Sequence, residues 1–472
     1  MMAWGVFLTA LGLAGINFFR GHFEDSDVTM LVEQAWKFKQ MGYLPSRNWG
    51  YPLYELSLYP LISTFGLTAA KFYSFVFYAA TGLLFFFWFR RVTKDSLKAF
   101  LGACCFLAHP LSIISGNSIG ETSQGIFLGT AALCFLFQFM EREKLPSLLL
   151  HSLFLGLAVA TRQDYLFLAA AFFTALFVFK RISLLRWAAA LLLFLGAALL
   201  PYILMYGPQH FSHLNTEFLQ NDSFSRKWVR SLFGYLSILG LPVFFLISFW
   251  FLKNWRKFRK FPAWLMANPA RFVLVAAWAF YFVRYVMLDT KQEYVSAILI
   301  PFFFFMAISL KRKSALGLVL AAVFLPNLFQ IHFFRKEGRF LRPGFGVSPG
   351  VFVQERYERL KQEYIFTGPY YPTLERIAKQ NFGCEKVHPY LDEAPGSDFC
   401  VIVPEERLRF WNPERWRQAT DRAALFKRKI IVFPFPDHRG WRQFIEFRKW
   451  RPLEPAMFRI FTEEGTATQP SL

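Results

Sequence analysis

The sequence predicts a polytopic α-helical membrane protein that carries a small α/β domain at its C-terminal end. Of its 472 residues, 55% are hydrophobic and 20% are aromatic, whereas only 18% are charged. Soluble proteins usually carry about a quarter charged residues. Here the charged residues stand in short clusters between long apolar runs, which is the pattern of helices that cross a membrane.

The apolar runs predict about eleven membrane-spanning helices, because a helix needs about 20 mostly apolar residues to cross the hydrocarbon core. The predicted spans are 3–19, 69–89, 97–115, 124–140, 147–161, 165–179, 187–206, 231–252, 272–288, 294–310 and 314–334. The first run lacks a basic start and a small-residue cleavage site, so we expect it to remain as a signal anchor.

Clusters of Lys and Arg predict which loops face the cytoplasm. They are Arg90, Arg91, Lys94 and Lys98; Lys180, Arg181 and Arg186; Lys253, Arg256, Lys257, Arg259 and Lys260; and Lys311, Arg312 and Lys313. The net charge of +21 is therefore interpreted as a topology signal and not as a nucleic-acid-binding face. With an odd number of spans in the cytoplasmic (inner) membrane, the loop 20–68 and the C-terminal domain are expected outside the cytoplasm.

The loop 20–68 is too long and too patterned for a simple connector. Apolar residues recur in it with helical spacing at Val28, Leu31, Ala35 and Phe38. This spacing predicts an amphipathic helix on the outer membrane surface. A second interfacial helix is expected to begin at Tyr51-Pro52, because Pro suits the first position of a helix.

After Phe334 the composition shifts to Arg, Lys, Glu and Pro, which divides the chain into a transmembrane domain, 1–334, and an extracytoplasmic domain, 335–472. Short β-prone runs such as Phe399–Val403 and Lys429–Phe433 alternate there with helical stretches, as in an α/β domain. In an oxidising compartment, Cys384 and Cys400 could form a disulfide, and the sequence leaves this question open.

Three carboxylates follow the first span directly, in the run Phe23-Glu24-Asp25-Ser26-Asp27. Transfer of a sugar to a hydroxyl or an amine needs a base, and Asp or Glu suits that role. In the alternative interpretation, Ser26 or Asp25 caps the next helix and the acids interact favourably with its dipole. The residues alone leave both interpretations open.

An acid directly after the first span, an interfacial helix that ends in Gly and an aromatic Pro-Leu-Tyr segment together resemble the type C glycosyltransferase superfamily. The resemblance is to the bacterial branch related to protein O-mannosyltransferases and lipid A aminoarabinose transferases. In that branch an Asp after the first span is followed eight residues later by Ala, as Asp27 is followed by Ala35 here. The resemblance implies that Asp27 is the catalytic base. Asp25 is the second candidate, because Val28 stands where the family often has a Glu.

The segment Tyr51-Pro52-Leu53-Tyr54-Glu55-Leu56 resembles the family's Pro-Pro-Leu-Tyr stretch. The Lys that often precedes this stretch is missing, and Arg47 would take its place. The resemblance implies that Tyr54 and Glu55 contact the substrate. A belt of interfacial aromatic residues would explain the tyrosines without any function, although it would not explain the charge of Glu55.

Two turns on the expected outer side resemble substrate-binding turns of the same family. Glu121 stands where the family often has an acidic or polar contributor, and it is either a ligand of the sugar hydroxyls or a solvated turn residue. The run Gly156–Asp164 resembles a Gly-Leu-Ala-x-x-Thr-Arg/Lys turn. The resemblance implies that Arg162 holds the carrier phosphate. An ion pair of Arg162 with Asp164 is the structural alternative.

A third turn, Asp289–Tyr294, is similar to the family's Lys-x-Glu-Arg/Trp-Tyr turn. The resemblance implies that Lys291 and Glu293 belong to the substrate site, where Lys291 would help to neutralise the leaving phosphate. The alternative is that Lys291 simply flanks a membrane span.

Together these motifs indicate an enzyme that transfers a sugar from a polyprenyl-phosphate donor to an extracytoplasmic acceptor, which is a protein, a lipid or an envelope glycan. Such an enzyme needs no metal and no cofactor, and its partners are the donor, the acceptor and membrane lipids. A transporter or lipid flippase is the main alternative, but it would carry charges midway along several spans and often two related halves, and neither is evident. A membrane scaffold with an extracytoplasmic binding domain is the other alternative.

Overall fold

The structure is a computed structural model. It describes residues 2–18, 31, 35, 51–180, 182–206, 241–253, 261–287, 296–310, 312–337, 340–349, 386–388, 399–404, 429–433, 459–461 and 467–468. The chain divides into two compact units, Met1–Gln354 and Glu355–Leu472. This division falls after the expected boundary at residue 335, because strand β1 (Phe329–Glu337) pairs with strand β2 (Phe340–Pro349) inside the first unit.

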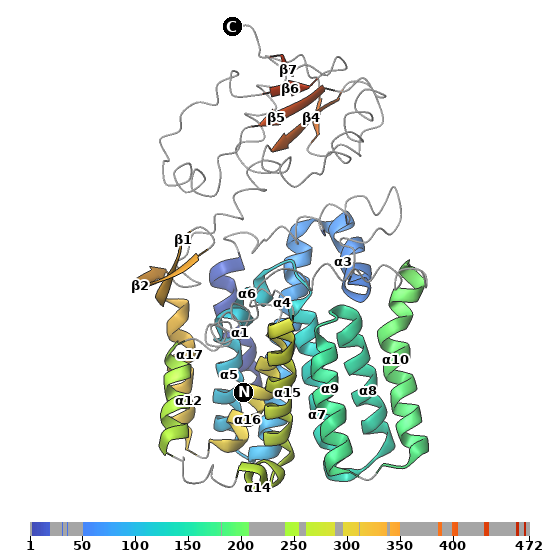
Figure 1. Cartoon of the computed structure of the whole chain (residues 1–472), viewed down its shortest axis with the longest axis vertical. Helices are drawn as coiled ribbons and strands as arrows, with labels where there is room; N and C mark the ends of the chain where they lie inside the picture. Colours follow the sequence, from blue (N-terminus) through green and yellow to red (C-terminus); the bar gives the residue numbers. More distant parts are fainter. Residues whose placement is uncertain are drawn as a thin grey trace. The chain divides into compact units, whose positions relative to one another are not determined.

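The first unit is a bundle of apolar helices, most of which stand side by side (Figure 1). The helices are α1 (Met2–Phe18), α3 (Pro52–Phe65), α4 (Leu67–Thr93), α5 (Ser96–Leu107), α6 (Pro110–Asn117), α7 (Thr122–Arg142), α8 (Leu145–Thr161), α9 (Tyr165–Phe179), α10 (Leu184–Tyr206), α12 (Leu241–Lys253), α14 (Phe261–Met266), α15 (Pro269–Met287), α16 (Leu299–Ser309) and α17 (Lys313–Phe324), which is followed by the 3-10 turn η4 (Leu325–Asn327).

The helical unit has the apolar character of a membrane protein. In the part of the chain that the structure describes, three helices are long and apolar enough to cross a membrane alone, namely Thr68–Thr93, Thr122–Arg142 and Leu184–Met205. The bent pair α5 and α6 makes a fourth if it counts as one span, and several shorter apolar helices accompany them. The expected number of eleven spans stays a prediction, because several expected runs match the shorter helices or lie partly outside these residues, and a break can divide one run into two helices.

Two of the expected spans contain such a break. The run 97–115 is not one straight helix, because α5 and α6 meet at an angle of 68°. Pro110 opens α6 and cannot continue the hydrogen bonds of α5. The run 314–334 is helical only to Phe324, and strand β1 then begins at Phe329.

The carbonyl groups at the α5–α6 break have new donors from neighbouring elements. The hydroxyl of Tyr78 on α4 donates to the carbonyl of Leu107 at 2.6 Å. The side-chain amide of Asn327 donates to the carbonyl of Ala108, also at 2.6 Å. In lipid, an unpaired backbone group costs several kcal/mol, so these contacts allow the chain to break inside the bundle.

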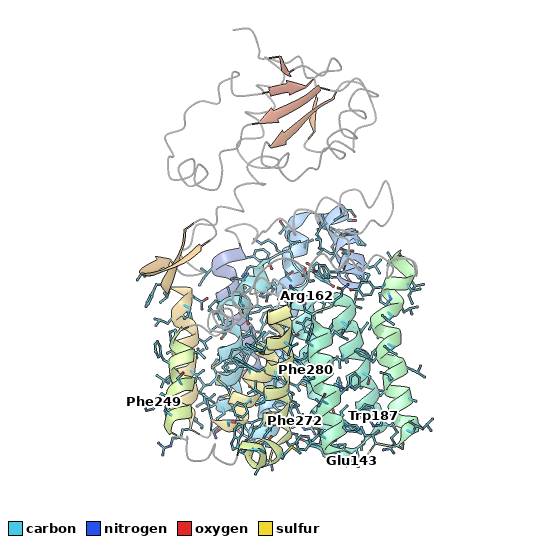
Figure 2. The ribbon with its side chains drawn as sticks, in the orientation of Figure 1. Glu143, Arg162, Trp187, Phe249, Phe272 and Phe280 are labelled. Carbon is cyan, nitrogen blue, oxygen red and sulfur yellow. The ribbon has the colours of Figure 1, made fainter. Side chains whose placement is uncertain are left out.

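The described basic clusters gather at one end of the bundle. Three ion pairs link the successive turns there: Arg91 with Glu141 at 2.6 Å, Lys180 with Glu143 at 2.5 Å, and Lys313 with Asp95 at 3.1 Å. The backbone N–H of Lys98 and the ammonium of Lys313 lower the pKa of Asp95. Glu143 lies at this end and Arg162 at the opposite end (Figure 2). These turns share one end, as the positive-inside pattern predicts.

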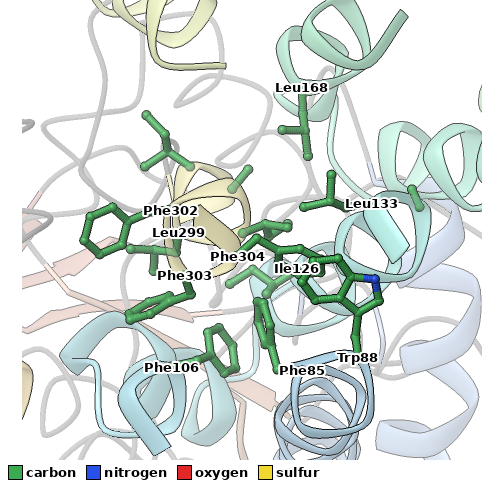
Figure 3. Packing of buried hydrophobic residues seen from close by; sticks show 14 of the residues in the cluster. Phe85, Trp88, Phe106, Ile126, Leu133, Leu168, Leu299, Phe302, Phe303 and Phe304 are labelled. Atoms are coloured by element: carbon green, nitrogen blue, oxygen red, sulfur yellow. The ribbon is translucent and has the colours of Figure 1, made fainter. Parts of the chain in front are cut away.

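The core of the bundle is built from interlocking aromatic rings. Phe304 of α16 lies 4.1 Å from Trp88 and 5.0 Å from Phe85, both on α4, as measured between ring centroids. Phe303 contacts Phe106 of α5 at 5.9 Å (Figure 3). Such contacts bury large apolar areas and favour tilted or edge-on ring pairs. They fix α16 against α4 and α5.

Two glycines of α7 make room for the first residue of α9. A Cβ atom on Gly125 would lie 2.7 Å from the ring of Tyr165, and a Cβ atom on Gly129 would lie 2.9 Å from the same ring. Small residues spaced by four allow this close approach between membrane helices. Because Tyr165 begins α9, the packing fixes the turn between α8 and α9 against α7.

The second unit contains a five-stranded sheet with the strand order β3-β4-β5-β6-β7. The strands are β3 (Lys386–His388), β4 (Phe399–Pro404), β5 (Lys429–Phe433), β6 (Arg459–Phe461) and β7 (Ala467–Thr468). Strands β3 to β5 are parallel and the other pairs are antiparallel. Two of the strands, β4 and β5, coincide with runs that the sequence marks as β-prone. Cys384 and the helical stretches expected between these strands lie outside the described residues, so the α/β character and the disulfide stay predictions.

The packing of α8 on α10 gives a test of the fold. A Cβ atom on Gly156 of α8 would lie 2.5 Å from the carbonyl oxygen of Phe194, which is a backbone atom and cannot rotate away. We expect Gly156→Ala to destabilise the protein by about 1–3 kcal/mol and to lower its melting temperature in detergent. Gly196→Ala on α10 is the control, because its Cβ would meet nothing within 4 Å. Equal melting temperatures for the two variants would contradict the helix packing.

Candidate active site

Arg162 is the charged residue around which the described site residues gather. It caps the C-terminal end of α8 in an extended conformation, and its backbone N–H donates to Ala158 at 2.9 Å. Its Nη1 lies 3.2 Å from Oε1 of Glu121, and its Nε lies 3.0 Å from Oδ2 of Asp164. Nη1 also donates to the hydroxyl of Thr122 at 3.0 Å. The guanidinium therefore joins the turn before α7 to the turn before α9.

This ion network is buried. The side chain of Arg162 is 3% exposed, that of Glu121 is 7% exposed and that of Asp164 is 15% exposed. Removing such charges from water is costly, and only close pairing with hydrogen bonds offsets the cost. The pair with Asp164 that the sequence offered as an alternative is thus present. A phosphate on Arg162 would share the five-donor guanidinium with these carboxylates or replace one of them.

Glu55 joins the same polar region from α3. It is fully buried in the first turn of α3, and its backbone N–H donates to Tyr51 at 2.8 Å. The hydroxyl of Tyr202 on α10 is within electrostatic range of both Glu55 and Asp164, and it lies beside the Gln163 side chain. Tyr202 thus lies in the same polar region as Glu55 and Asp164.

The first loop reaches this region through two of its residues. Leu31 and Ala35 are helical and buried, and they pack in one apolar cluster with Tyr54 and Leu58 of α3 and with Ile119. Ile119 lies two residues before Glu121. The spacing expected for an amphipathic helix is consistent with this contact, since Leu31 and Ala35 are one helical turn apart. Tyr54 is fully buried here and stands 6.1 Å from the Tyr73 ring.

Lys71 is a buried cation that the sequence motifs do not include. It lies on α4 next to Ala70, which belongs to the same apolar cluster as Tyr54. Its ammonium donates to the carbonyl of Phe18, the last residue of α1, and lies 5.0 Å from the centroid of the Phe18 ring. Its side chain is almost fully buried. A Lys inside an apolar run is itself a sign of function, and this sign was present in the sequence.

The structure brings together four of the nine residues that the sequence proposes for the site: Tyr54, Glu55, Glu121 and Arg162. The other five, Asp25, Asp27, Arg47, Lys291 and Glu293, lie outside the described residues. Their roles stay predictions. Among the residues that the structure describes, no group of three or more His, Cys, Asp and Glu side chains is arranged to hold a metal ion.

The arrangement has a definite chemical character. Three carboxylates, on Glu55, Glu121 and Asp164, lie at one end of the bundle with the guanidinium of Arg162 and the phenol of Tyr202. Carboxylates accept hydrogen bonds from hydroxyl groups, and the guanidinium of Arg162 holds Glu121 and Asp164 in place. Such a surface suits a ligand with several hydroxyl groups, such as a sugar.

Replacing Arg162 tests whether this network organises the end of the bundle. Arg162→Met leaves two carboxylates buried without their cation, which typically costs about 3–5 kcal/mol, so we expect a much lower melting temperature. Glu121→Gln combined with Arg162→Met should cost less than the sum of the two changes, because the two residues are in contact. Arg91→Met is the matched control, since it removes an exposed ion pair. If both Arg variants melt alike, Arg162 does not organise the site.

Comparisons with known proteins give few matches to this chain. No model of a protein family matches it, and no curated protein matches it. A solved structure to which it is similar is that of ArnT from Cupriavidus metallidurans, bound to undecaprenyl phosphate. The similarity has a TM-score of 0.49 at 16% sequence identity, and it covers 68% of this chain and 60% of that chain.

Proposed function

We propose that this protein is a membrane glycosyltransferase that moves a sugar from a polyprenyl-phosphate carrier to an acceptor outside the cytoplasm. One observation carries the proposal: Leu31 and Ala35 of the first loop pack against α3 and Ile119, beside the Glu121–Arg162 network. The acidic run Glu24–Asp27 comes just before Leu31 in the chain. A lipid-linked donor would also explain a polar site at the end of a membrane bundle.

In the proposed reaction, Asp27 takes the proton from the hydroxyl or amine of the acceptor. The acceptor atom forms a bond to the anomeric carbon of the sugar while the bond from that carbon to the carrier phosphate oxygen breaks. The phosphate leaves with the electron pair of that bond. Lys291 and Arg47 stabilise its charge, in the way that positioned cations stabilise developing charge elsewhere. Asp25 is the alternative base.

We assign Glu121 and Glu55 to the sugar hydroxyls. Glu121 is suited to this role because Arg162 holds one of its oxygens in a fixed position. Arg162 then acts first as the residue that positions Glu121 and Asp164. Contact with the carrier phosphate would be its second role. Tyr54 supports the first loop from within the apolar cluster.

The substitution Asp27→Asn tests whether Asp27 is the catalytic base. Positioned bases typically contribute about 10²–10⁴-fold to the rate, so we expect Asp27→Asn to reduce transfer by at least about 10²-fold. Cells that carry this variant should accumulate lipid-linked sugar and lose one glycan decoration, as shown by mass spectrometry of both pools. Glu33→Gln, an acid of the same loop on the opposite side of the expected helix, should change neither pool.

The same measurement separates the other interpretations. Loss of transfer with Asp25→Asn but not with Asp27→Asn would move the base to Asp25. If neither variant changes the glycans at normal protein levels, the carboxylates are helix caps and the enzyme proposal is wrong. Flux of a lipid-linked sugar across vesicles that contain the purified protein, with no transfer of the sugar, would favour the transporter.

A further inference from the structure

The hairpin of β1 and β2 leaves the bundle directly after its last helix. α17 begins at Lys313, in the ion pair with Asp95, so its other end lies at the end of the bundle that carries Arg162. η4 follows, and β1 starts at Phe329. The hairpin therefore begins at the end of the apolar bundle that is opposite the basic turns (Figure 1). In the first unit it is a separate two-stranded sheet, and such a sheet is at best marginally stable in water.

The pairing of the two strands places apolar residues together on one face of the hairpin. Phe329 pairs with Pro349, and Ile331 pairs with Val347. Because strand residues alternate between faces, these four positions lie on the same face, together with Phe333. The positions between them, such as Gln330 opposite Ser348, lie on the other face. The described side chains on the apolar face are exposed, with 38% for Phe329 and 62% for Val347.

The same face carries two arginines directly opposite each other. The register shifts after His332, and Arg335 then pairs with Arg342. Residues 335 and 333 are two apart on β1, so Arg335 lies on the face of Phe333. Like charges directly opposite each other on a sheet repel and destabilise it. An anion bound at these paired positions would offset the repulsion between the two charges.

We propose that the β1–β2 hairpin lies on the outer surface of the membrane and binds the headgroup phosphate of an anionic phospholipid. The apolar patch around Ile331 and Val347 enters the interfacial region of the bilayer, and the Arg335–Arg342 pair contacts the phosphate. The combination of an apolar patch with basic residues next to it is the one that interfacial segments use on anionic membranes. This inference does not depend on the proposed enzymatic function.

Neighbouring positions on β2 provide the test. A single cysteine is placed at Val347 or at Ser348 of the full-length protein, after its five native cysteines have been replaced, and is labelled with an environment-sensitive fluorophore in nanodiscs. Lipid-borne nitroxide should quench the label at 347 several-fold more than the label at 348, and aqueous iodide should show the opposite order. Equal iodide quenching at the two positions would overturn the proposal. Shielding of 347 that persists in detergent would also overturn it, because protein and not lipid would then cover the face.

A second experiment tests whether the arginine pair binds the anionic headgroup. In nanodiscs of phosphatidylglycerol, the label at 347 should be quenched by lipid nitroxide more than in nanodiscs of phosphatidylcholine. Arg335→Gln combined with Arg342→Gln should abolish this difference, whereas Lys336→Gln on the opposite face should preserve most of it. If the double variant keeps the full preference for the anionic lipid, the arginine pair does not bind the headgroup.

Discussion

The end of the bundle that carries the candidate site depends on the burial of Arg162 between Glu121 and Asp164. A guanidinium that is 3% exposed is stable only with close anionic partners, and here one cation has two of them. The partners come from two different turns, so the ion network sets the distance between α7 and the α8–α9 turn. The ring of Tyr165 against Gly125 and Gly129 fixes the same two elements by shape.

Breaks in the helices follow the same rule that every polar group removed from water needs a partner. The α5–α6 break is tolerated because Tyr78 and Asn327 donate to the carbonyls that it exposes. The break also brings the chain back toward the site, since α6 leads into the turn of Glu121. A straight helix over 97–115 would have carried these residues elsewhere. The position of Glu121 is thus a consequence of Pro110 and of two donors far away in the sequence.

Apolar patterning predicted the helical class, most helix positions and the common end of the basic turns, because these depend on local composition. It did not predict the bend at Pro110 or the strand at Phe329, which depend on partners such as Asn327 that only the folded chain supplies. For the candidate site, the motif around Arg162 indicated the right turn. Its pairing with Glu121 was not foreseen, because the two residues are 41 positions apart. Lys71 was overlooked because a single Lys does not change the apolar character of its span.

The charges of the described site residues also limit what can bind there. The carboxylates of Glu55, Glu121 and Asp164 outnumber the cations of Lys71 and Arg162, and Arg162 already contacts two of the carboxylates. A site with this balance suits neutral hydroxyl groups better than a phosphate. The carrier phosphate would therefore need further cations, and the sequence offers Arg47 in the first loop and Lys291 in the turn before α16. Under the proposed function, the sugar and the phosphate would then be held by different parts of the chain. The anomeric carbon would lie between them, where the base must also reach the acceptor.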